Sequence, residues 1–152
     1  MKFLVLSVGK PRDAALALAI AEYEQRAARY WPLEMVAVRE ESGRGDAALV
    51  RLREGARLLK QAGAARIVSC DEGGDTMDSR TFAAFLQRAR EDARDMAFVI
   101  GGAFGLDDSV RVASERCLAL APWTLPHELA RVLLAEQLYR AGTIVRREPY
   151  HK

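Results

Sequence analysis

Cysteine and histidine are scarce in this chain of 152 residues. Each occurs only twice, and the two cysteines, Cys70 and Cys117, lie far apart with no Cys-x-x-Cys spacing. A disulfide framework or a zinc site usually needs several such residues at short spacings, so both are strongly disfavoured. We therefore expect no metal ion and two buried thiols.

Long apolar runs are also absent. The longest helical apolar stretch, AALALAIA at 14–21, is far shorter than the roughly 20 residues that span a bilayer. The opening MKFLVLSVGK, residues 1–10, carries no small-residue cleavage pattern of a secretory signal. These features predict a cytoplasmic protein that does not enter a membrane.

Charge of one sign is not abundant either. The net charge of +2 does not by itself indicate a nucleic-acid-binding protein. The basic side chains are nearly all arginine, which suits contacts with phosphate but is equally expected from a high-GC genome. Basic residues are concentrated only in the tail, at Arg140, Arg146, Arg147, His151 and Lys152. The four cations of this group are candidate RNA contacts.

Short apolar segments alternate with helical patterns along the whole chain. Apolar runs predict five strands, at 3–8, 33–38, 66–70, 97–100 and from 117. Apolar spacing and capping residues predict five helices, at 13–30, 46–63, 78–94, 107–115 and 126–141. The polar segment DEGGD, 71–75, is predicted to be a turn. The pattern indicates one α/β domain over 1–152, with a parallel sheet covered by helices on both faces.

A glycine-rich loop follows the fourth predicted strand, in FVIGGAFGLDDSV at 98–110. Ligands of open α/β sheets bind beyond the carboxyl ends of the strands, where this loop lies. The spacing of Gly101, Gly102 and Gly105 is not that of a dinucleotide fingerprint, and no Gly-Lys-Ser/Thr of a phosphate-binding loop follows. Spacing alone leaves a plain tight turn as an alternative to a binding loop.

Four segments together resemble one known family. They are MKFLVLSVGK at 1–10, IGGAFGL at 100–106, TLPHELARVLLAEQLYRA at 124–141 and PYHK at 149–152. The chain is similar from end to end to the ribosomal RNA large subunit methyltransferase H (RlmH) family, SPOUT-class enzymes that methylate pseudouridine. The resemblance implies a SPOUT-type sheet whose C-terminal part forms a trefoil knot, a rare exception to unknotted folds.

The resemblance also implies a cofactor site for S-adenosylmethionine in the knot loops. Carried over to this sequence, the contacts fall on Cys70 and Gly101, and on the segment Leu120, Ala121, Pro122, Trp123, Thr124 and Leu125. Loop backbone groups can bind the adenine edge, while the apolar side chains can form walls. Gly101 and Gly102 are expected to clear space for the cofactor.

The implied reaction is methylation of N3 of pseudouridine 1915 in 23S rRNA, on the assembled ribosome. The group that removes the N3 proton, the general base, works best if its pKa is near neutrality. We assign His151 as the residue that orients the pyrimidine or handles the N3 proton, with Tyr150 stacking on the pyrimidine ring. Asp71 is kept as the alternative general base. His127 lies in the first turn of the last helix, and its simpler interpretation is a capping or packing role.

The last predicted helix is apolar on nearly every side. Val132, Leu133, Leu134, Leu138 and Tyr139 form one band, and a helix apolar all round is buried on more than one side. A two-fold homodimer is the predicted reason, with a helix central to the core as the alternative. The resemblance implies that each site is completed by the partner's tail.

Three other functions stay open from the sequence. The chain could be a SPOUT enzyme acting on transfer RNA, although such enzymes often carry an additional RNA-binding domain, for which this length leaves no room. It could be a non-enzymatic ribosome-associated binding protein with a degenerate pocket. A small-molecule α/β enzyme with a nucleotide cofactor is disfavoured by the missing fingerprints.

Overall fold

A five-stranded parallel sheet forms the centre of the molecule in the computed structural model, which describes residues 1–42 and 45–152. The strands lie in the order β2-β1-β4-β3-β5, and every neighbouring pair is parallel. Their bounds are β1 Phe3–Val8, β2 Leu33–Val38, β3 Arg66–Thr76, β4 Met96–Ile100 and β5 Arg116–Ala119. The predicted α/β class is confirmed.

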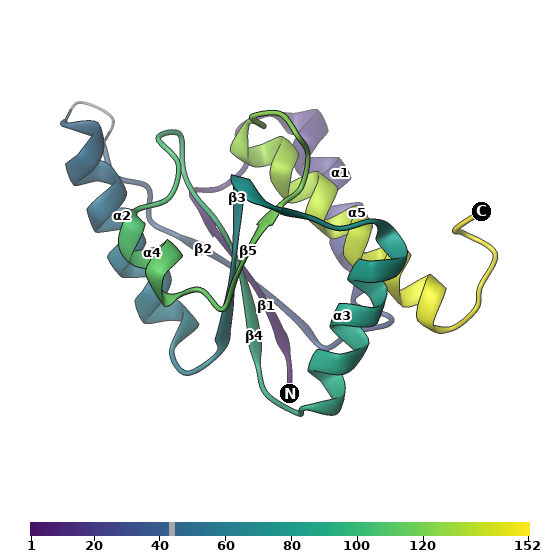
Figure 1. The fold of residues 1–152 in the computed structure, drawn as a ribbon. Helices are drawn as coiled ribbons and strands as arrows, with labels where there is room; N and C mark the ends of the chain where they lie inside the picture. Colours follow the sequence, from purple (N-terminus) through teal and green to yellow (C-terminus); the bar gives the residue numbers. More distant parts are fainter. Residues whose placement is uncertain (43–44) are drawn as a thin grey trace.

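Helices cover both faces of this sheet (Figure 1). One face carries α1 (Ala14–Ala27), α3 (Ser79–Glu91) and α5 (His127–Val145), and the other carries α2 (Ala47–Ala62) and α4 (Asp108–Ala113). Two separate clusters of buried side chains lie between the sheet and these two layers. Because both faces are covered, the strands are apolar almost throughout, as the sequence indicated.

Four of the five helices begin at an aspartate whose side chain accepts a backbone N–H of the first turn. Each such cap stabilises its helix by about 1 kcal/mol, because it satisfies a donor that the helix itself cannot. The pairs are Asp13 with Leu16, Asp46 with Ala48, Asp78 with Thr81 and Asp107 with Ser109. These caps place the helix starts within one residue of the predicted ones.

The core beneath α5 contains two residues of the band that was predicted to reach a partner subunit. Leu134 and Leu138 are fully buried in the core of this chain, whereas Val132, Leu133 and Tyr139 are half-buried. Trp31 donates its indole N–H to the carbonyl of Leu138 at 2.8 Å and packs edge-on against Phe3. The interface prediction is therefore wrong for Leu134 and Leu138, which pack inward on the sheet. This packing matches the alternative prediction of a helix central to the core.

Strand β3 is longer than predicted, because the segment DEGGD is extended and does not form a turn. Asp75 and Thr76 pair with Leu118 and Ala119 of β5, after a register shift that begins at Cys70. A Cβ at Gly74 would lie 2.6 Å from the carbonyl carbon of Cys117. The glycine thus lets the two backbones pass closely, and pairing with β5 overrides the polar composition of the segment.

Helix α5 is also longer than predicted and continues through Val145. Gly142 lies against the ring of Tyr30, where any Cβ would overlap the ring. The close contact explains a glycine inside a helix, which otherwise destabilises it by about 1 kcal/mol. Within the described residues, no helix is both long enough and apolar enough to cross a membrane. The trefoil knot stays a prediction.

Candidate functional site

A cavity of about 380 Å³ opens at the carboxyl ends of β3, β4 and β5. Figure 1 shows the loops after β4 and β5 leaving the sheet at this end. The cavity walls come from the end of β3, the glycine-rich loop at 101–106, the loop at 120–125 and the start of α5. Because the last two of these parts are continuous in the chain, three segments that are far apart in the sequence meet at one cavity.

The structure brings most of the predicted cofactor residues together around this cavity. Seven of the eight line it, namely Cys70, Gly101, Leu120, Ala121, Trp123, Thr124 and Leu125. Pro122 is not among the lining residues. The position is the one where open α/β sheets bind ligands, and its apolar walls and loop backbone suit a small molecule with an adenosine group.

The glycine-rich loop is a tight turn folded on itself. The N–H of Gly105 donates to the carbonyl of Gly102 at 3.0 Å, and Gly105 has a φ of 80°, which favours glycine. A Cβ at Gly101 would lie 2.7 Å from the carbonyl carbon of Gly105. Gly101 is therefore required by the loop's own backbone, which differs from the expectation that it clears space for a ligand.

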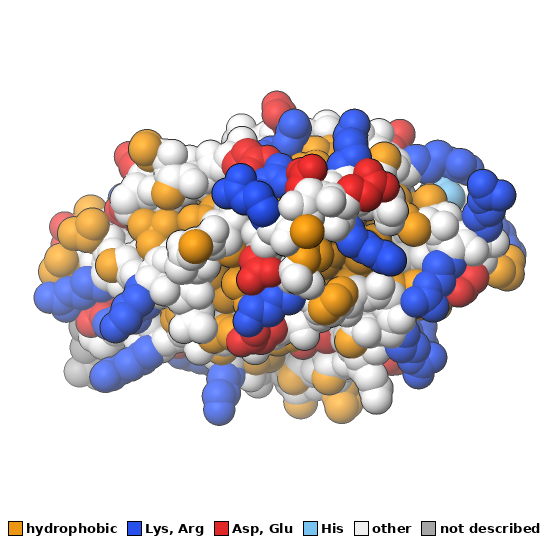
Figure 2. Space-filling view, turned by 90° about the horizontal axis from the view of Figure 1, so that it is seen from below, with side chains coloured by type: hydrophobic (Ala, Val, Ile, Leu, Met, Phe, Trp, Pro, Cys, Tyr) orange, Lys and Arg blue, Asp and Glu red, His pale blue; other side chains and the backbone are white. Residues whose placement is uncertain are grey.

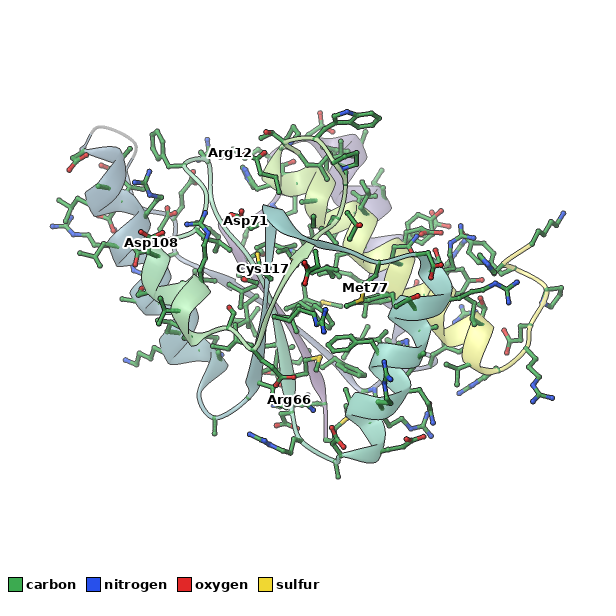
Figure 3. All side chains as sticks on the ribbon, viewed as in Figure 1. Arg12, Arg66, Asp71, Met77, Asp108 and Cys117 are labelled. Carbon is green, nitrogen blue, oxygen red and sulfur yellow. The ribbon has the colours of Figure 1, made fainter. Side chains whose placement is uncertain are left out.

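An ion pair lies at the polar side of the cavity. Arg111 Nη2 lies 2.7 Å from Asp71 Oδ2, and both residues line the cavity. Burial acts to raise the pKa of Asp71, but hydrogen bonds from Arg111 and the N–H of Gly73 outweigh it and lower the pKa. Figure 3 shows Asp71 at the cavity end of β3 and Asp108, which also pairs with Arg111, on α4. Asp71 is thus a poor general base near neutral pH.

The two cysteines are less buried than predicted. Both Cys70 and Cys117 are half-buried. Burial of the thiol, followed by the influence of the neighbouring Cys117 and Asp71, nonetheless raises the pKa of Cys70 to about 12. Cys70 therefore stays a neutral thiol, and its contribution to the cavity wall is steric.

His127 is the first residue of α5 and lines the cavity. Its Nε2 lies 4.0 Å from Glu128 Oε1. Glu128 also accepts the backbone N–H groups of Arg12 and Asp13, which join the start of α5 to the start of α1. His127 thus has a fixed backbone and a half-buried ring at the cavity edge.

The C-terminal tail folds back on α5 of the same chain. Tyr150 donates its hydroxyl to Glu136 at 3.0 Å, and its ring lies 4.6 Å from that of Tyr139. The Arg140 guanidinium lies over the Tyr150 ring, and His151 Nδ1 is 3.5 Å from Arg140 Nη1. Burial, followed by hydrogen bonding with Tyr23 and Glu136, raises the pKa of Tyr150. Tyr150 is therefore neutral and ordered.

These tail residues are remote from the cavity of the same subunit. At about 1.5 Å per residue, Glu136 lies about 13 Å and Arg140 about 20 Å along α5 from His127. Tyr150 and His151 contact these two positions, so they lie well along the helix from its cavity end. The structure does not bring the predicted catalytic and cofactor residues together within one subunit.

The side chains predicted to contact RNA differ in their exposure and in their contacts within the chain. Arg140 is engaged, since its Nε donates to Glu136 at 3.0 Å. Arg146 is exposed but donates to the carbonyl of Arg29 and lies over the Tyr30 ring, while Arg147 and Lys152 are exposed. Figure 2 shows the end of the molecule opposite the cavity, where basic side chains are mixed with acidic and apolar ones. Charge alone does not mark that end as an RNA-binding surface.

Comparison with known proteins identifies the family. Residues 1–151 match the family described as "Predicted SPOUT methyltransferase". Ribosomal RNA large subunit methyltransferase H of Gemmatimonas aurantiaca is 58% identical over the full length of both chains. The chain belongs to this family of SPOUT methyltransferases. The protein of the same name from Geobacter metallireducens is 46% identical over 99% of each chain.

Solved structures of two other proteins share the fold at low sequence identity. A probable methyltransferase from Bordetella pertussis has a TM-score of 0.60 at 16% identity, covering 92% of this chain and 95% of its own. A probable methylase family protein from Haemophilus influenzae has a TM-score of 0.57 at 12% identity, covering 99% and 70%. At these identities the likeness concerns the fold alone.

Sequence reasoning missed several residues that line the site of this SPOUT protein. Phe104, Glu72 and Arg111 line the cavity, and the Thr124 hydroxyl donates to Glu72. Trp123 and Phe104 are large apolar side chains that remain 74% and 42% exposed at its edge. Glu72 and Phe104 closely follow the predicted strands at 66–70 and 97–100, and this position was the available signal, because ligands bind there. Arg111 gave no such signal, since it reaches the cavity from α4.

Proposed function

We propose that this protein transfers a methyl group from S-adenosylmethionine to N3 of pseudouridine 1915 in 23S rRNA, on the assembled ribosome. The observation that carries the proposal is the meeting of the loops at 101–106 and 120–125 around one cavity at the carboxyl ends of three strands. Membership of a family with close relatives named ribosomal RNA large subunit methyltransferase H supports the reaction and the substrate. A cytoplasmic location follows from that substrate.

The cavity residues fit the cofactor. Leu120, Ala121 and Leu125 offer apolar contacts for an adenine ring, and the loop backbones offer donors and acceptors for its edge. Asp71 and Glu72 are acidic residues of the wall, suited to a ligand that carries a sulfonium and an ammonium group. Bound S-adenosylmethionine supplies an electrophilic methyl group, and the role of the protein is to hold the target nitrogen in line with it.

Loss of the N3 proton requires a base or an orienting group near the target. Asp71 is unsuited, because its ion pair with Arg111 lowers its pKa. His151 and Tyr150 remain our candidates, with His151 orienting the pyrimidine or handling the proton and Tyr150 stacking on the ring. His127 lines the cavity and is a further ionisable group at the edge.

The position of the tail supports a homodimer in which the tail of one subunit completes the cavity of the other. Tyr150 and His151 contact α5 about 13 to 20 Å along its axis from the cavity of their own subunit. A two-fold interface exchanges the same segment in both directions, so it supplies two complete sites. The tail cations Arg140, Arg146, Arg147 and Lys152 then lie beside the rRNA that enters each site.

Methylation of purified substrates tests the proposal. Wild-type protein is incubated with methyl-labelled S-adenosylmethionine and with ribosomes, separated large subunits or free rRNA, and the modified nucleoside is mapped. We expect label at N3 of one pseudouridine, with whole ribosomes as the best substrate. Label in transfer RNA, or at a ribose or another ring position, would overturn the proposed substrate. Cofactor binding without transfer to any RNA would favour a binding protein.

A further inference from the structure

A carboxyl group is buried beneath the glycine-rich loop and takes no part in the site described above. Glu54 lies on α2, is only 3% exposed, and does not line the cavity. Its Oε1 accepts the backbone N–H of Glu41 at 3.0 Å. Its Oε2 is buried and has no hydrogen-bond partner among the described residues. Buried polar atoms are rarely left unsatisfied, so this oxygen needs an explanation.

The unpartnered oxygen faces the glycine-rich loop. A Cβ at Gly102 would lie 2.6 Å from Glu54 Oε2, closer than to any other atom. The next residue, Gly55, packs against the end of the same loop, since its Cβ would lie 3.0 Å from the Cβ of Asp107. Two consecutive residues of α2 therefore support the loop at Gly102 and at the cap of α4. Gly102 itself lines the cavity on its other side.

The surroundings of Glu54 disfavour its charged form. Burial is the largest influence and raises its pKa, while the hydrogen bond from the N–H of Glu41 opposes the rise. The carboxylates of Glu40 and Glu41 raise it further, and Arg57 lowers it. Arg57 is itself engaged by Glu41, and Arg12 by Glu40. Among residues 1–42 and 45–152, no cation forms an ion pair with Glu54, and a buried unpaired carboxylate is costly.

We propose that Glu54 is a positioning residue for the cofactor cavity, whose buried carboxyl group supports Gly102 from beneath and holds the glycine-rich loop in its binding shape. It touches no ligand and acts only through the loop. In the neutral acid the proton resides on the unpartnered oxygen, which becomes a hydrogen-bond donor towards the loop backbone. The effect on ligand affinity rests on the proposed cofactor site, whereas the effect on the loop does not.

Ionisation of Glu54 is expected to loosen the loop. A carboxyl group with a raised pKa in the folded state stabilises the structure below its ordinary pKa of 4.5, and that stability is lost as the pH rises through the folded value. Above that value, a charge lies under Gly102 and draws water into the contact. Glutamine at this position keeps the shape and a donor but cannot ionise, so it should retain the loop and remove its pH dependence.

Two measurements test this inference at about pH 4, below the ordinary pKa of 4.5 for a glutamate side chain, and at about pH 9. Amide hydrogen exchange of residues 101–106 without ligand, expressed as protection factors, reports on the loop itself. Calorimetric titration with S-adenosylhomocysteine reports on the cavity. Both are made on wild type, Glu54→Gln and Glu54→Ala, with Glu91→Gln as a control, because Glu91 is exposed at the end of α3.

In wild type and Glu91→Gln we expect loop protection and ligand affinity to fall about threefold to tenfold from the lower to the higher pH, as suits ionisation of one group. Glu54→Gln should keep the wild-type values of the lower pH at both, and Glu54→Ala should lose protection at both. Because His127 also lines the cavity, the ligand titration is judged only by the difference in affinity between wild type and Glu54→Gln.

Loop protection in wild type that is equal at both pH values overturns the proposal, as does a pH dependence that persists in Glu54→Gln. If Glu54→Gln does not fold, the test uses wild type alone and compares the protection factors of the loop amides with those of the β4 amides at the two pH values. Only the loop amides should respond to pH. Failure of wild type to bind S-adenosylhomocysteine would contradict the proposed function. The hydrogen-exchange result would still test the effect of Glu54 on the loop.

Discussion

Arg111 of α4 and Asp71 in the middle of β3 form an ion pair across the side of the cavity, with Nη2 2.7 Å from Oδ2. The pair joins a helix on one face of the sheet to the strand that carries the cavity wall. It also holds the pKa of Asp71 below its ordinary value despite partial burial, which would raise it. Asp71 is therefore poorly suited to accept a proton near neutral pH.

We predict that Arg111→Gln raises the pKa of Asp71, because burial then acts without its counter-ion. The wild-type ion pair stabilises the fold above the ordinary Asp pKa of 3.8, and this stability is lost as the pH falls through the lower folded value. Arg111 is 39% exposed, so the loss in unfolding free energy at neutral pH should be about 1 kcal/mol or less. Carboxyl NMR titration and denaturant unfolding measure both effects. An unchanged Asp71 titration would contradict the assignment.

Gly101→Ala should weaken S-adenosylmethionine binding by about tenfold or more while the sheet stays folded. The new Cβ would lie 2.7 Å from the Gly105 backbone, so the loop must shift at the cavity wall, and about 1.4 kcal/mol corresponds to tenfold. The matched control is Gly45→Ala, whose Cβ meets nothing within 4 Å. Calorimetry measures the affinity, and circular dichroism checks the fold. Equal affinities for both variants would remove the loop from the site.

Leu134→Ala should lower the unfolding free energy by about 2 to 5 kcal/mol, because it opens a cavity in the core beneath α5. Leu18→Ala on α1 is the control. Leu18 is 74% exposed, so its change should stay within about 0.5 kcal/mol. Denaturant unfolding gives both values, and sedimentation gives the oligomeric state. Loss of assembly by folded Leu134→Ala protein, with little loss of stability, would restore Leu134 to an interface.

The regular parts of the fold could be predicted because they follow local patterns. The bounds of β1 and β2 match the apolar runs, and aspartate caps mark the starts of four helices. The segment at 71–75 could not be predicted, since its polar and glycine residues favour a turn. It is extended because Asp75 and Thr76 hydrogen-bond to β5, a contact between distant parts of the chain.

The site was predicted through resemblance more than through residue pattern. The loop at 120–125 carries no phosphate-binding or metal-binding spacing, yet five of its six residues line the cavity. Glu54 gave no signal at all, because a single glutamate in an amphipathic helix is normally exposed. Only its position against Gly102 and its exposure of 3% show that it is buried. The remote position of the tail likewise depends on the length of α5, which the sequence underestimated.

Replacing Arg146 and Arg147 together with serine should weaken ribosome binding and reduce its salt dependence. Both side chains are exposed, and each lost phosphate contact lowers the slope of log affinity against log salt by about one unit. Arg88 and Arg90 at the end of α3 are exposed too, and their double replacement is the control. Binding is measured by filter retention at several salt concentrations. Equal slopes for both double variants would exclude a specific role for the tail cations.

The most direct test of a methyltransferase site shared between two subunits mixes two inactive variants. Gly101→Val disables the cavity but keeps the tail, and deletion of residues 149–152 removes the tail but keeps the cavity. Each variant alone should transfer no methyl group to ribosomes. After subunit exchange, half of the dimers combine one intact cavity with the partner's intact tail, so about a quarter of wild-type activity should return. A mixture as inactive as its components, although mixed dimers have formed, would contradict a site completed by the partner's tail.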